Sequence, residues 1–393
     1  MNENFRLFLT QELESLNQKG LKRQMRILDG AQDAHVYIDG KEYLNFCSNN
    51  YLGLANHKRL KMAAIEEIKA NGVGAGASRL VCGTLKVHQL LEEKIAQFKG
   101  AESCLIFNTG YMANVGIISS LFDTNDIIFC DKFNHASIID GIMLSGAKLK
   151  RYPHGDMSAL EEMLRKETGC RKRVIITDSV FSMDGDMAPL DKIVFLAKKY
   201  DCLVMIDEAH ALGVLGKNGK GAAEYFGVEK DIDIQMGTLS KAVGSLGAYV
   251  CGSKDLISFL INRARSFIYT TALPTSVIAA ASEGLDIIQT DSLLRKELWN
   301  KTFFLYNNLR KMGFDLLNTQ TPIIPILVKD AVKAVKFSQR LFEKGILISA
   351  IRPPTVPPHT ARLRLTVMAT HTQQELEKLL DVLERIGQEL CLI

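Results

Sequence analysis

Two residues near the ends of apolar runs have side chains suited to chemistry on a carbonyl group. Asp207 follows the run CLVMI, and Lys241 lies within GTLSKAVGSLG, shortly after the run DIQM. A free lysine has a pKa near ~10.4, so only a small fraction of it is neutral and nucleophilic at pH 7. Burial or a nearby cation lowers that pKa, and an imine with an aldehyde removes the problem altogether. Lys241 is therefore the candidate for covalent attachment of an aldehyde.

Two segments could supply backbone N–H groups to a phosphate. One is the turn Asn108-Thr-Gly-Tyr111, which opens a helix, and the other is the Thr, Ser and Gly loop around Lys241. Helix N-termini attract phosphate because their first N–H groups have no partner within the helix. An aldehyde-binding lysine, a phosphate loop and a carboxylate (Asp207) that keeps a pyridine nitrogen protonated are the requirements of pyridoxal 5'-phosphate (PLP). The sequence therefore predicts PLP as the cofactor.

The segment Asp207-Glu208-Ala209-His210 also has two other interpretations. A nucleotide-driven motor would need a GxxxxGK[ST] loop, but the nearest segment, GVLGKNGKG, has the wrong spacing and no Ser or Thr after its Lys. A metal site would need further ligands beside Asp207 and His210, and the sequence suggests none, so we expect no metal. The stretch GVGAGA matches GxGxxA but follows a helix, which argues against a dinucleotide site.

Charge and cysteine usage narrow the class of protein further. Lys and Arg number 48 against 44 Asp and Glu, a net charge of +4, and the basic residues form no long run. We therefore expect no nucleic-acid and no membrane partner. Eight cysteines are scattered without CxxC pairs or zinc-finger spacing, which favours the reducing cytoplasm. The apolar window Ser103–Phe122 is interrupted by polar residues and predicts a strand, a turn and a helix start rather than a membrane span.

Short apolar runs that end in polar residues recur from about residue 100 and alternate with helical segments. The runs are SCLIF, DIIFC, RVIITD, CLVMI and DIQM. Fully apolar strands separated by helices predict an α/β fold with a mainly parallel sheet that is covered on both faces. Ligands bind beyond the carboxyl ends of such strands, and Asp207 lies at one of these ends.

The chain is too long for a single core. Its 393 residues exceed the roughly 250–300 at which one hydrophobic core stops growing. We expect an N-terminal segment (1–54) with a helix and a hairpin at Asp39-Gly40, packed on the small domain. A large PLP-binding domain (55–285) and a small α+β domain (286–393) follow. The last domain is expected to end in a helix that opens with a Thr372–Glu375 capping box.

The sequence resembles the α-oxoamine synthases, a family of fold-type I PLP enzymes. The similarity covers almost the whole chain and is carried by these blocks: SNNYLGLANH, GASRLVCGT, FNTGYMANVG, FNHASIIDG, SVFSMDGDMAPL, IDEAHALGVLG, GTLSKAVGSLGAY, FIYTTALP and IRPPTVPPHTARLRLT. The resemblance implies the fold-type I architecture, with a seven-stranded type of sheet in the large domain. Asp178-Ser179 and Ala211-Leu212 differ from the residues that are frequent at those positions in the family.

The resemblance also implies a set of site residues. The catalytic group would be Lys241, His135, Asp207 and His210, with Lys241 bound to the cofactor, Asp207 at its ring nitrogen and His135 stacked on its ring. The remaining cofactor contacts would be Ser182 and His210 near the ring oxygen, Gly110, Tyr111 and Thr238 at the phosphate, and Thr270 and Thr271 reaching that phosphate from a second subunit. Substrate contacts would be Arg23, His135, Arg352, Thr355 and Arg364, because Arg side chains suit carboxylates.

Within the family, GASRL and IRPPTVP are most similar to the members that act in biotin biosynthesis. This implies a decarboxylative condensation of L-alanine with a pimeloyl thioester by a cytoplasmic homodimer whose active site lies at the subunit interface. A glycine-using acyltransferase of the same family is the nearest alternative. An aminotransferase or aldolase of the same fold, and a non-catalytic partner subunit, are more distant ones.

Overall fold

A seven-stranded sheet forms the centre of the protein. The computed structural model describes residues 1–19, 21–23 and 25–393. The strand order is β3-β9-β8-β7-β6-β4-β5, and only β9 runs against the others. The strands are β3 (Ser103–Phe107), β4 (Ile127–Asp131), β5 (Lys148–Tyr152), β6 (Arg173–Asp178), β7 (Leu203–Asp207), β8 (Ile234–Thr238) and β9 (Ala248–Gly252). The predicted α/β class with a mainly parallel seven-stranded sheet is confirmed.

Burial explains which strands were recognisable from the sequence. Every residue of β4 and β8 is buried, as expected for strands that are covered on both faces. Strands β5 and β9 were not predicted. The sequence of β5, KLKRY, carries three cations because β5 lies at the sheet edge, where charged side chains reach water and discourage pairing with another chain.

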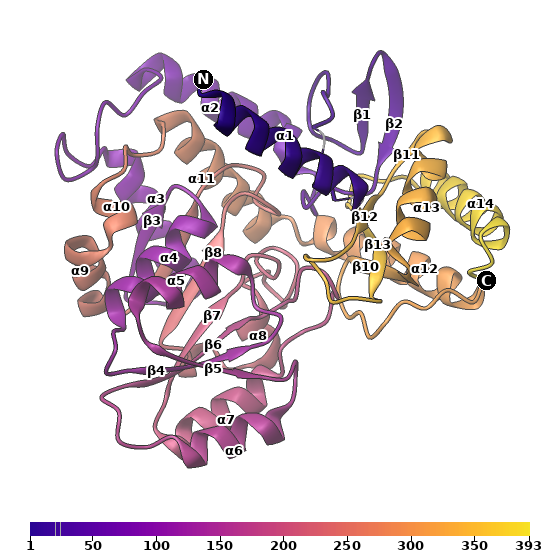
Figure 1. The fold of residues 1–393 in the computed structure, drawn as a ribbon. Coiled ribbons are helices and arrows are strands. Elements are labelled where there is room, and N and C mark those ends of the chain that lie inside the picture. Colours follow the sequence, from indigo (N-terminus) through magenta and orange to yellow (C-terminus); the bar gives the residue numbers. More distant parts are fainter. Residues whose placement is uncertain (20, 24) are drawn as a thin grey trace.

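Helices cover both faces of this sheet (Figure 1). On one face lie α4 (Gly110–Leu121), α5 (Ala136–Ser145), α9 (Lys254–Arg263) and α10 (Arg265–Ile268). On the other face lie α3 (Lys86–Lys99), α6 (Met157–Lys166), α7 (Leu190–Tyr200), α8 (Ala222–Phe226) and α11 (Thr275–Thr290), with α2 (Lys58–Asn71) packed against α11. The short 3-10 turns η1 (Leu54–Asn56) and η2 (Glu229–Asp231) complete this part of the chain.

Two small sheets lie beside the large one, and one of them pairs strands from the N-terminal and C-terminal parts of the chain. It consists of the predicted hairpin, β1 (His35–Ile38) and β2 (Lys41–Asn45), with β11 (Ile346–Leu347) parallel to β2. The other contains β10 (Ile323–Lys329), β13 (Ala361–Thr366) and β12 (Ser349–Ile351). Helices α12 (Ser292–Lys311), α13 (Ala331–Glu343) and α14 (Gln373–Glu389) belong to this region. The division of the chain at residues 54 and 285 stays a prediction.

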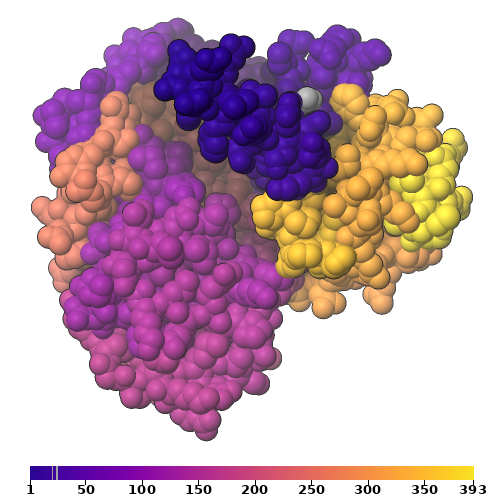
Figure 2. All heavy atoms as spheres, in the orientation of Figure 1, coloured from indigo at the N-terminus to yellow at the C-terminus, as the bar shows by residue number. Residues whose placement is uncertain are grey.

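Both terminal helices form where the sequence predicted them, but they differ in burial. Helix α14 opens with the predicted capping box of Thr372 and Glu375. Helix α1 (Glu3–Gln18) buries none of its residues, and Phe5 and Phe8 are more than half exposed. Figure 2 shows α1 in indigo, lying across the surface of the molecule. None of the helices in the described part of the chain has the length and hydropathy needed to cross a bilayer.

Candidate active site

The carboxyl ends of three neighbouring parallel strands bring the predicted polar residues together. In the register of the sheet, Asp178 at the end of β6 pairs with Asp207 at the end of β7. Asp207 in turn pairs with Met236 of β8, which ends at Thr238. Because the strands are parallel, these side chains meet at the carboxyl ends of the strands, as the α/β pattern predicted.

The Asp207 carboxylate is buried and held in a fixed orientation. The Asn114 side-chain amide of α4 donates to its Oδ2 at 2.8 Å, and the backbone N–H of Ala209 donates to its Oδ1 at 2.8 Å. The Asn114 amide also donates to the Ser137 hydroxyl at 2.9 Å. A carboxylate can accept about four hydrogen bonds, so Asp207 retains acceptor capacity for a protonated ring nitrogen.

Lys241 is joined to His210 and Tyr51 by a chain of short contacts. Lys241 Nζ lies 2.9 Å from His210 Nε2, and His210 Nδ1 lies 2.6 Å from the Tyr51 hydroxyl. Burial lowers the pKa of Lys241 to about 8, although the charges of Asp207 and Asp178 oppose this shift. Burial, with the nearby Lys241 charge, holds the pKa of His210 well below its usual value. At neutral pH the Lys241–His210–Tyr51 series of contacts therefore contains a neutral imidazole and a lysine that loses its proton readily.

A tight loop fixes the backbone around Lys241. The Thr238 hydroxyl donates to the Gly247 carbonyl at 2.8 Å and accepts from the Ser240 N–H at 3.2 Å, which ties the end of β8 to the start of β9. Gly244 has a φ of +77°, and a Cβ there would lie 2.5 Å from the Leu54 carbonyl carbon. Only glycine fits this close approach of two backbones.

The start of α4 lies beside this loop and offers N–H groups to an anion. The Thr109 hydroxyl accepts from the Met112 N–H at 3.1 Å. The first N–H groups of the helix, at Gly110 and Tyr111, have no partner within the helix and can bind an anion. A Cβ at Gly110 would lie 4.0 Å from the Thr238 Cβ, which places the two predicted phosphate contacts next to each other. Asn108 donates to the Thr271 carbonyl of the same chain at 2.8 Å, and the reach of Thr270 and Thr271 to the phosphate of a second subunit stays a prediction.

His135 is the N-cap residue of α5 and lies beside the same site. Its backbone N–H donates to Asp178 Oδ2 at 2.6 Å, and its Nδ1 lies 2.8 Å from the Ser137 hydroxyl. Partial desolvation lowers the pKa of His135, the Asp207 charge opposes this shift, and the Lys241 charge adds to it. Burial and the Asp207 charge raise the pKa of Asp178 well above its usual range. His135 is therefore held as a neutral ring.

Arg364 reaches the site from β13 of the small sheet. Its guanidinium donates to the Ser182 carbonyl at 2.5 Å, to Asn49 Oδ1 at 3.0 Å and to Thr366 Oγ1 at 2.9 Å. The side chain is buried, and within the described ranges no carboxylate lies within ion-pair distance of it. A buried guanidinium without an anionic neighbour is suited to a carboxylate ligand.

Thr355 lies on a cavity next to the site, whereas Arg23 and Arg352 are not brought into the cluster. The cavity has a volume of about 830 Å³ and is lined by His135, Ser182 and Thr355 among others. Arg352 is half-buried just before the Pro353–Pro358 segment that lines the cavity. Arg23 is exposed, and in the described residues no hydrogen bond joins it to the other predicted site residues.

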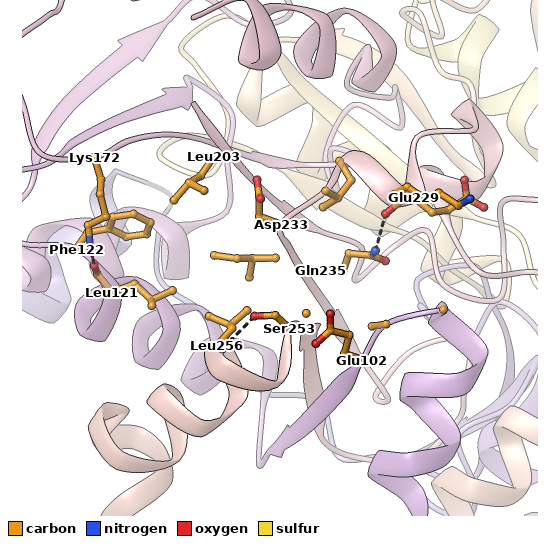
Figure 3. A pocket seen from close by; sticks show the side chains of 16 residues that line it. Glu102, Leu121, Phe122, Lys172, Leu203, Glu229, Asp233, Gln235, Ser253 and Leu256 are labelled. Atoms are coloured by element: carbon orange, nitrogen blue, oxygen red, sulfur yellow. Dashed lines mark hydrogen bonds between the residues drawn. The ribbon is translucent and has the colours of Figure 1, made fainter. Parts of the chain in front are cut away.

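A second cavity, of about 490 Å³, lies near the amino ends of β7 and β8, away from the carboxyl ends that carry the site (Figure 3). Leu203, Asp233 and Gln235 line it, and it contains none of the predicted site residues. Across residues 1–19, 21–23 and 25–393, no group of three or more His, Cys, Asp or Glu side chains is placed to hold a metal ion.

Three residues of the site were not identified from the sequence. Tyr51 and Asn114 lie in the blocks SNNYLGLANH and FNTGYMANVG, but their contacts with His210 and Asp207 connect residues far apart in the chain. Asp178 was noted only as a departure from the family pattern. Its position at the end of a predicted strand next to that of Asp207 was the available signal.

The chain is similar to known proteins over almost its whole length. Residues 41–383 match the family described as Aminotransferase class I and II. The 8-amino-7-oxononanoate synthase of Geobacter sulfurreducens is 49% identical over 97% of this chain and 98% of its own. A solved 8-amino-7-oxononanoate synthase from Francisella tularensis is similar with a TM-score of 0.78 and 32% identity, over 88% of this chain and 98% of that one. A serine palmitoyltransferase from S. paucimobilis with bound PLP–myriocin is similar with a TM-score of 0.94 and 30% identity, over 100% of both chains.

The chain belongs to the aminotransferase class I and II family and, within it, to the α-oxoamine synthases, which are PLP-dependent acyltransferases. The residues present fit the cofactor. The site has a lysine of lowered pKa, an oriented buried carboxylate and free helix N–H groups beside Thr238. The Asn114 side-chain oxygen is buried and has no hydrogen-bond partner in the described part of the protein, which leaves one further acceptor near Asp207.

The lowered pKa of Lys241 predicts how its reactivity depends on pH. Only the neutral amine attacks an acylating reagent, and burial lowers the pKa of this group to about 8. In cofactor-free protein, modification of Lys241 by an amine-specific reagent should therefore increase with a midpoint near pH 8, as followed by peptide mass spectrometry. Ordinary surface lysines, which titrate near ~10.4, are the internal control. A Lys241 midpoint equal to theirs would contradict the assignment.

Proposed function

We propose that this protein catalyses the decarboxylative condensation of L-alanine with a pimeloyl thioester. The products are 8-amino-7-oxononanoate, CO2 and free thiol, and the reaction belongs to biotin biosynthesis. The observation that carries this proposal is the 49% identity, over nearly the full length of both chains, to a relative named for that product. The organisation of the site around Lys241, Asp207 and Arg364 supports it.

The proposed function gives each of the cofactor residues a role. Lys241 would bind the cofactor through its amine, Asp207 would pair with the ring nitrogen, and His135 would lie on the ring face. The phosphate would be bound by Gly110, Tyr111 and Thr238, while Ser182 and His210 would contact the ring oxygen. When bound, PLP withdraws electrons from the α-carbon of the amino acid, which makes both loss of a proton and loss of CO2 easier.

Lys241 would be the group that moves the substrate proton. With a pKa lowered to about 8, it is neutral in a substantial fraction near physiological pH and can accept the α-proton of alanine. The neutral His210, 2.9 Å from Lys241 Nζ, orients the amine without adding charge. The buried Arg364 would bind the alanine carboxylate, and Arg23 and Arg352 would contact the acyl donor.

The cavity beside His135 is suited to the acyl donor. It has a volume of about 830 Å³, and its lining includes Phe133, Phe181 and the segment Pro353–Pro358, which contains Thr355. This lining offers apolar contacts to a methylene chain. His135 is among the lining residues, so a thioester bound there would lie near the proposed cofactor site.

We further propose that the active protein is a cytoplasmic homodimer with shared active sites. Several apolar side chains are exposed on the segment 269–275, which contains Thr270 and Thr271, and on the segment 72–82 that contacts it, and a partner subunit would cover them. Val73, Val81 and Tyr269 are 68%, 79% and 72% exposed. In the proposed dimer, Thr270 and Thr271 reach the phosphate of the partner subunit.

The substrates are tested by incubating purified protein with PLP, each of Ala, Gly and Ser, and either pimeloyl-CoA or acetyl-CoA. We expect 8-amino-7-oxononanoate from alanine and pimeloyl-CoA, measured by mass spectrometry. Lys241→Ala should lower that rate by at least about a thousandfold, because it removes both the cofactor attachment and the base. Turnover only with glycine and acetyl-CoA would instead show the alternative acyltransferase, and full activity of Lys241→Ala would refute its role.

The shared site is tested by mixing two inactive variants. Thr271→Glu should repel the cofactor phosphate, and Lys241→Ala removes the attachment point. If Thr271 acts on the partner subunit, a mixed dimer contains one site with both native residues, and the mixture regains activity that neither variant has alone. Thr270→Glu tests the neighbouring residue in the same way. No recovery in a mixture that is shown to contain mixed dimers would contradict the shared site.

A further inference from the structure

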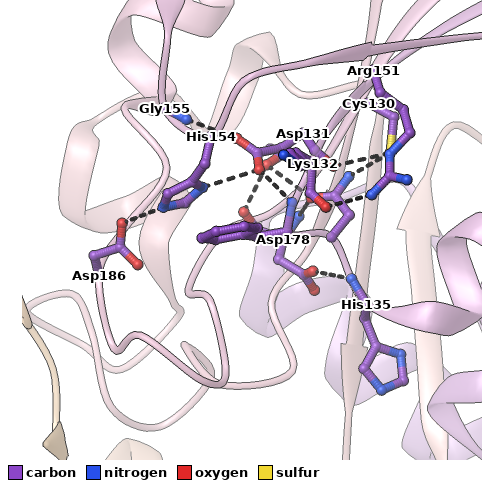
Figure 4. Close-up of polar contacts among 12 residues, drawn as sticks. Cys130, Asp131, Lys132, His135, Arg151, His154, Gly155, Asp178 and Asp186 are labelled. Atoms are coloured by element: carbon purple, nitrogen blue, oxygen red, sulfur yellow. Dashed lines mark hydrogen bonds and ion pairs between the residues drawn. The ribbon is translucent and has the colours of Figure 1, made fainter. Parts of the chain in front are cut away.

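His154 lies between two acidic residues, Asp131 and Asp186, near the turn that leads into His135 (Figure 4). Its Nδ1 lies 3.0 Å from Asp131 Oδ1, and its Nε2 lies 2.8 Å from Asp186 Oδ2. A neutral imidazole has only one N–H, so hydrogen bonds from both nitrogens to carboxylates require the charged imidazolium. Although burial opposes it, these two carboxylates raise the pKa of His154 to about 10. His154 is therefore a fixed positive charge between two turns of the chain.

The Asp131 side of this bridge builds the turn that carries His135. The buried Asp131 carboxylate accepts from the Phe133 N–H at 2.8 Å and from the Gly155 N–H at 2.9 Å. The Asn134 N–H then donates to the Asp131 carbonyl, and His135 follows as the first residue before α5. The orientation of Asp131 thus sets the path of the backbone into His135.

The Asp186 side of the bridge belongs to the turn that carries Ser182. The Asp186 carbonyl accepts from the Phe181 N–H at 3.0 Å, which closes the turn between them. Within that turn, the Ser182 carbonyl accepts from Arg364 at 2.5 Å. His154 is therefore connected through one turn to His135 and through the other to Arg364.

Two aromatic contacts place the same ring against the wall of the acyl cavity. The Phe133 ring stacks on His154 with centroids 4.4 Å apart, and the Phe181 ring meets it edge-on at 4.4 Å. Both phenylalanines line the cavity that also contains His135 and Ser182. The imidazolium therefore supports the cavity wall as well as the two turns.

We propose that His154 is a positioning residue that holds the His135 turn and the Ser182 turn at the separation that the cofactor and amino acid require. The inference rests on the proposed function, because it takes His135, Ser182 and Arg364 as ligand contacts. Without the imidazolium, Asp131 and Asp186 would face each other uncompensated and the two turns would separate.

His154→Gln tests this inference, because it removes the charge and can rebuild only one of the two hydrogen bonds to a carboxylate. We expect the Kd for PLP, titrated by visible absorbance, and the KM for alanine each to rise by roughly tenfold, as for loss of one charge-assisted hydrogen bond.

His35→Gln is the matched control. His35 also bridges two carboxylates, Glu42 at 3.2 Å and Glu375 at 2.5 Å, but joins the small sheet to α14. This control should leave both constants within about twofold of the native values.

Adding Asp186→Asn to His154→Gln should restore most of the PLP affinity. The glutamine amide nitrogen can then donate to Asp131, while its oxygen accepts from the new amide in the Ser182 turn. An unchanged Kd for PLP in folded His154→Gln, or an equal loss in His35→Gln, would overturn the inference. The PLP titration requires no acyl transfer, so protein that binds PLP but does not condense alanine with pimeloyl-CoA would refute the proposed function and leave this test intact.

Discussion

The site depends on one physical constraint: an amine and two carboxylates are buried together at the ends of adjacent parallel strands. The register of β6 and β7 forces Asp178 and Asp207 side by side, and burial raises the pKa of Asp178 well above its usual range. The same burial lowers the pKa of Lys241 to about 8. Buried charges are costly unless they are paired or neutralised, so the cationic ring of the proposed cofactor would offset part of the cost of burying Asp207. The surrounding contacts, from Asn114 on one side to His210 on the other, maintain that geometry.

The fold also connects distant parts of the chain to this constraint. Arg364 comes from the small sheet and donates to Ser182 of the large-sheet region and to Asn49 of the N-terminal segment. Arg362, two residues earlier on β13, pairs with Asp184 at 2.6 Å and so binds the same turn. The turn that contains Ser182 is therefore held by the small sheet on one side and by His154 on the other. A displacement of the small sheet would move the turn and the cavity wall together.

Much of this site could be predicted from the sequence because its main residues follow recognisable apolar runs. Asp207 and Thr238 lie at ends of predicted strands, and Lys241 lies in a loop whose small residues are unusual around a lysine. Asn114 and Tyr51 could not be predicted in the same way, because their roles arise from contacts across 93 and 159 residues of sequence. Strand β5 was missed because its edge position permits charged residues that obscure the apolar pattern. The sequence also gave no sign that His154 connects two turns, since neither acidic partner is close to it in the chain.

Reductive trapping of the cofactor tests the central claim most directly. The protein is loaded with PLP, reduced with borohydride, digested and mapped by mass spectrometry. If Lys241 binds the cofactor in the orientation set by Asp207, the phosphopyridoxyl mass should appear on the peptide that contains Lys241, and Asp207→Asn should reduce its yield. Label on another lysine, or no label after loading, would contradict the account.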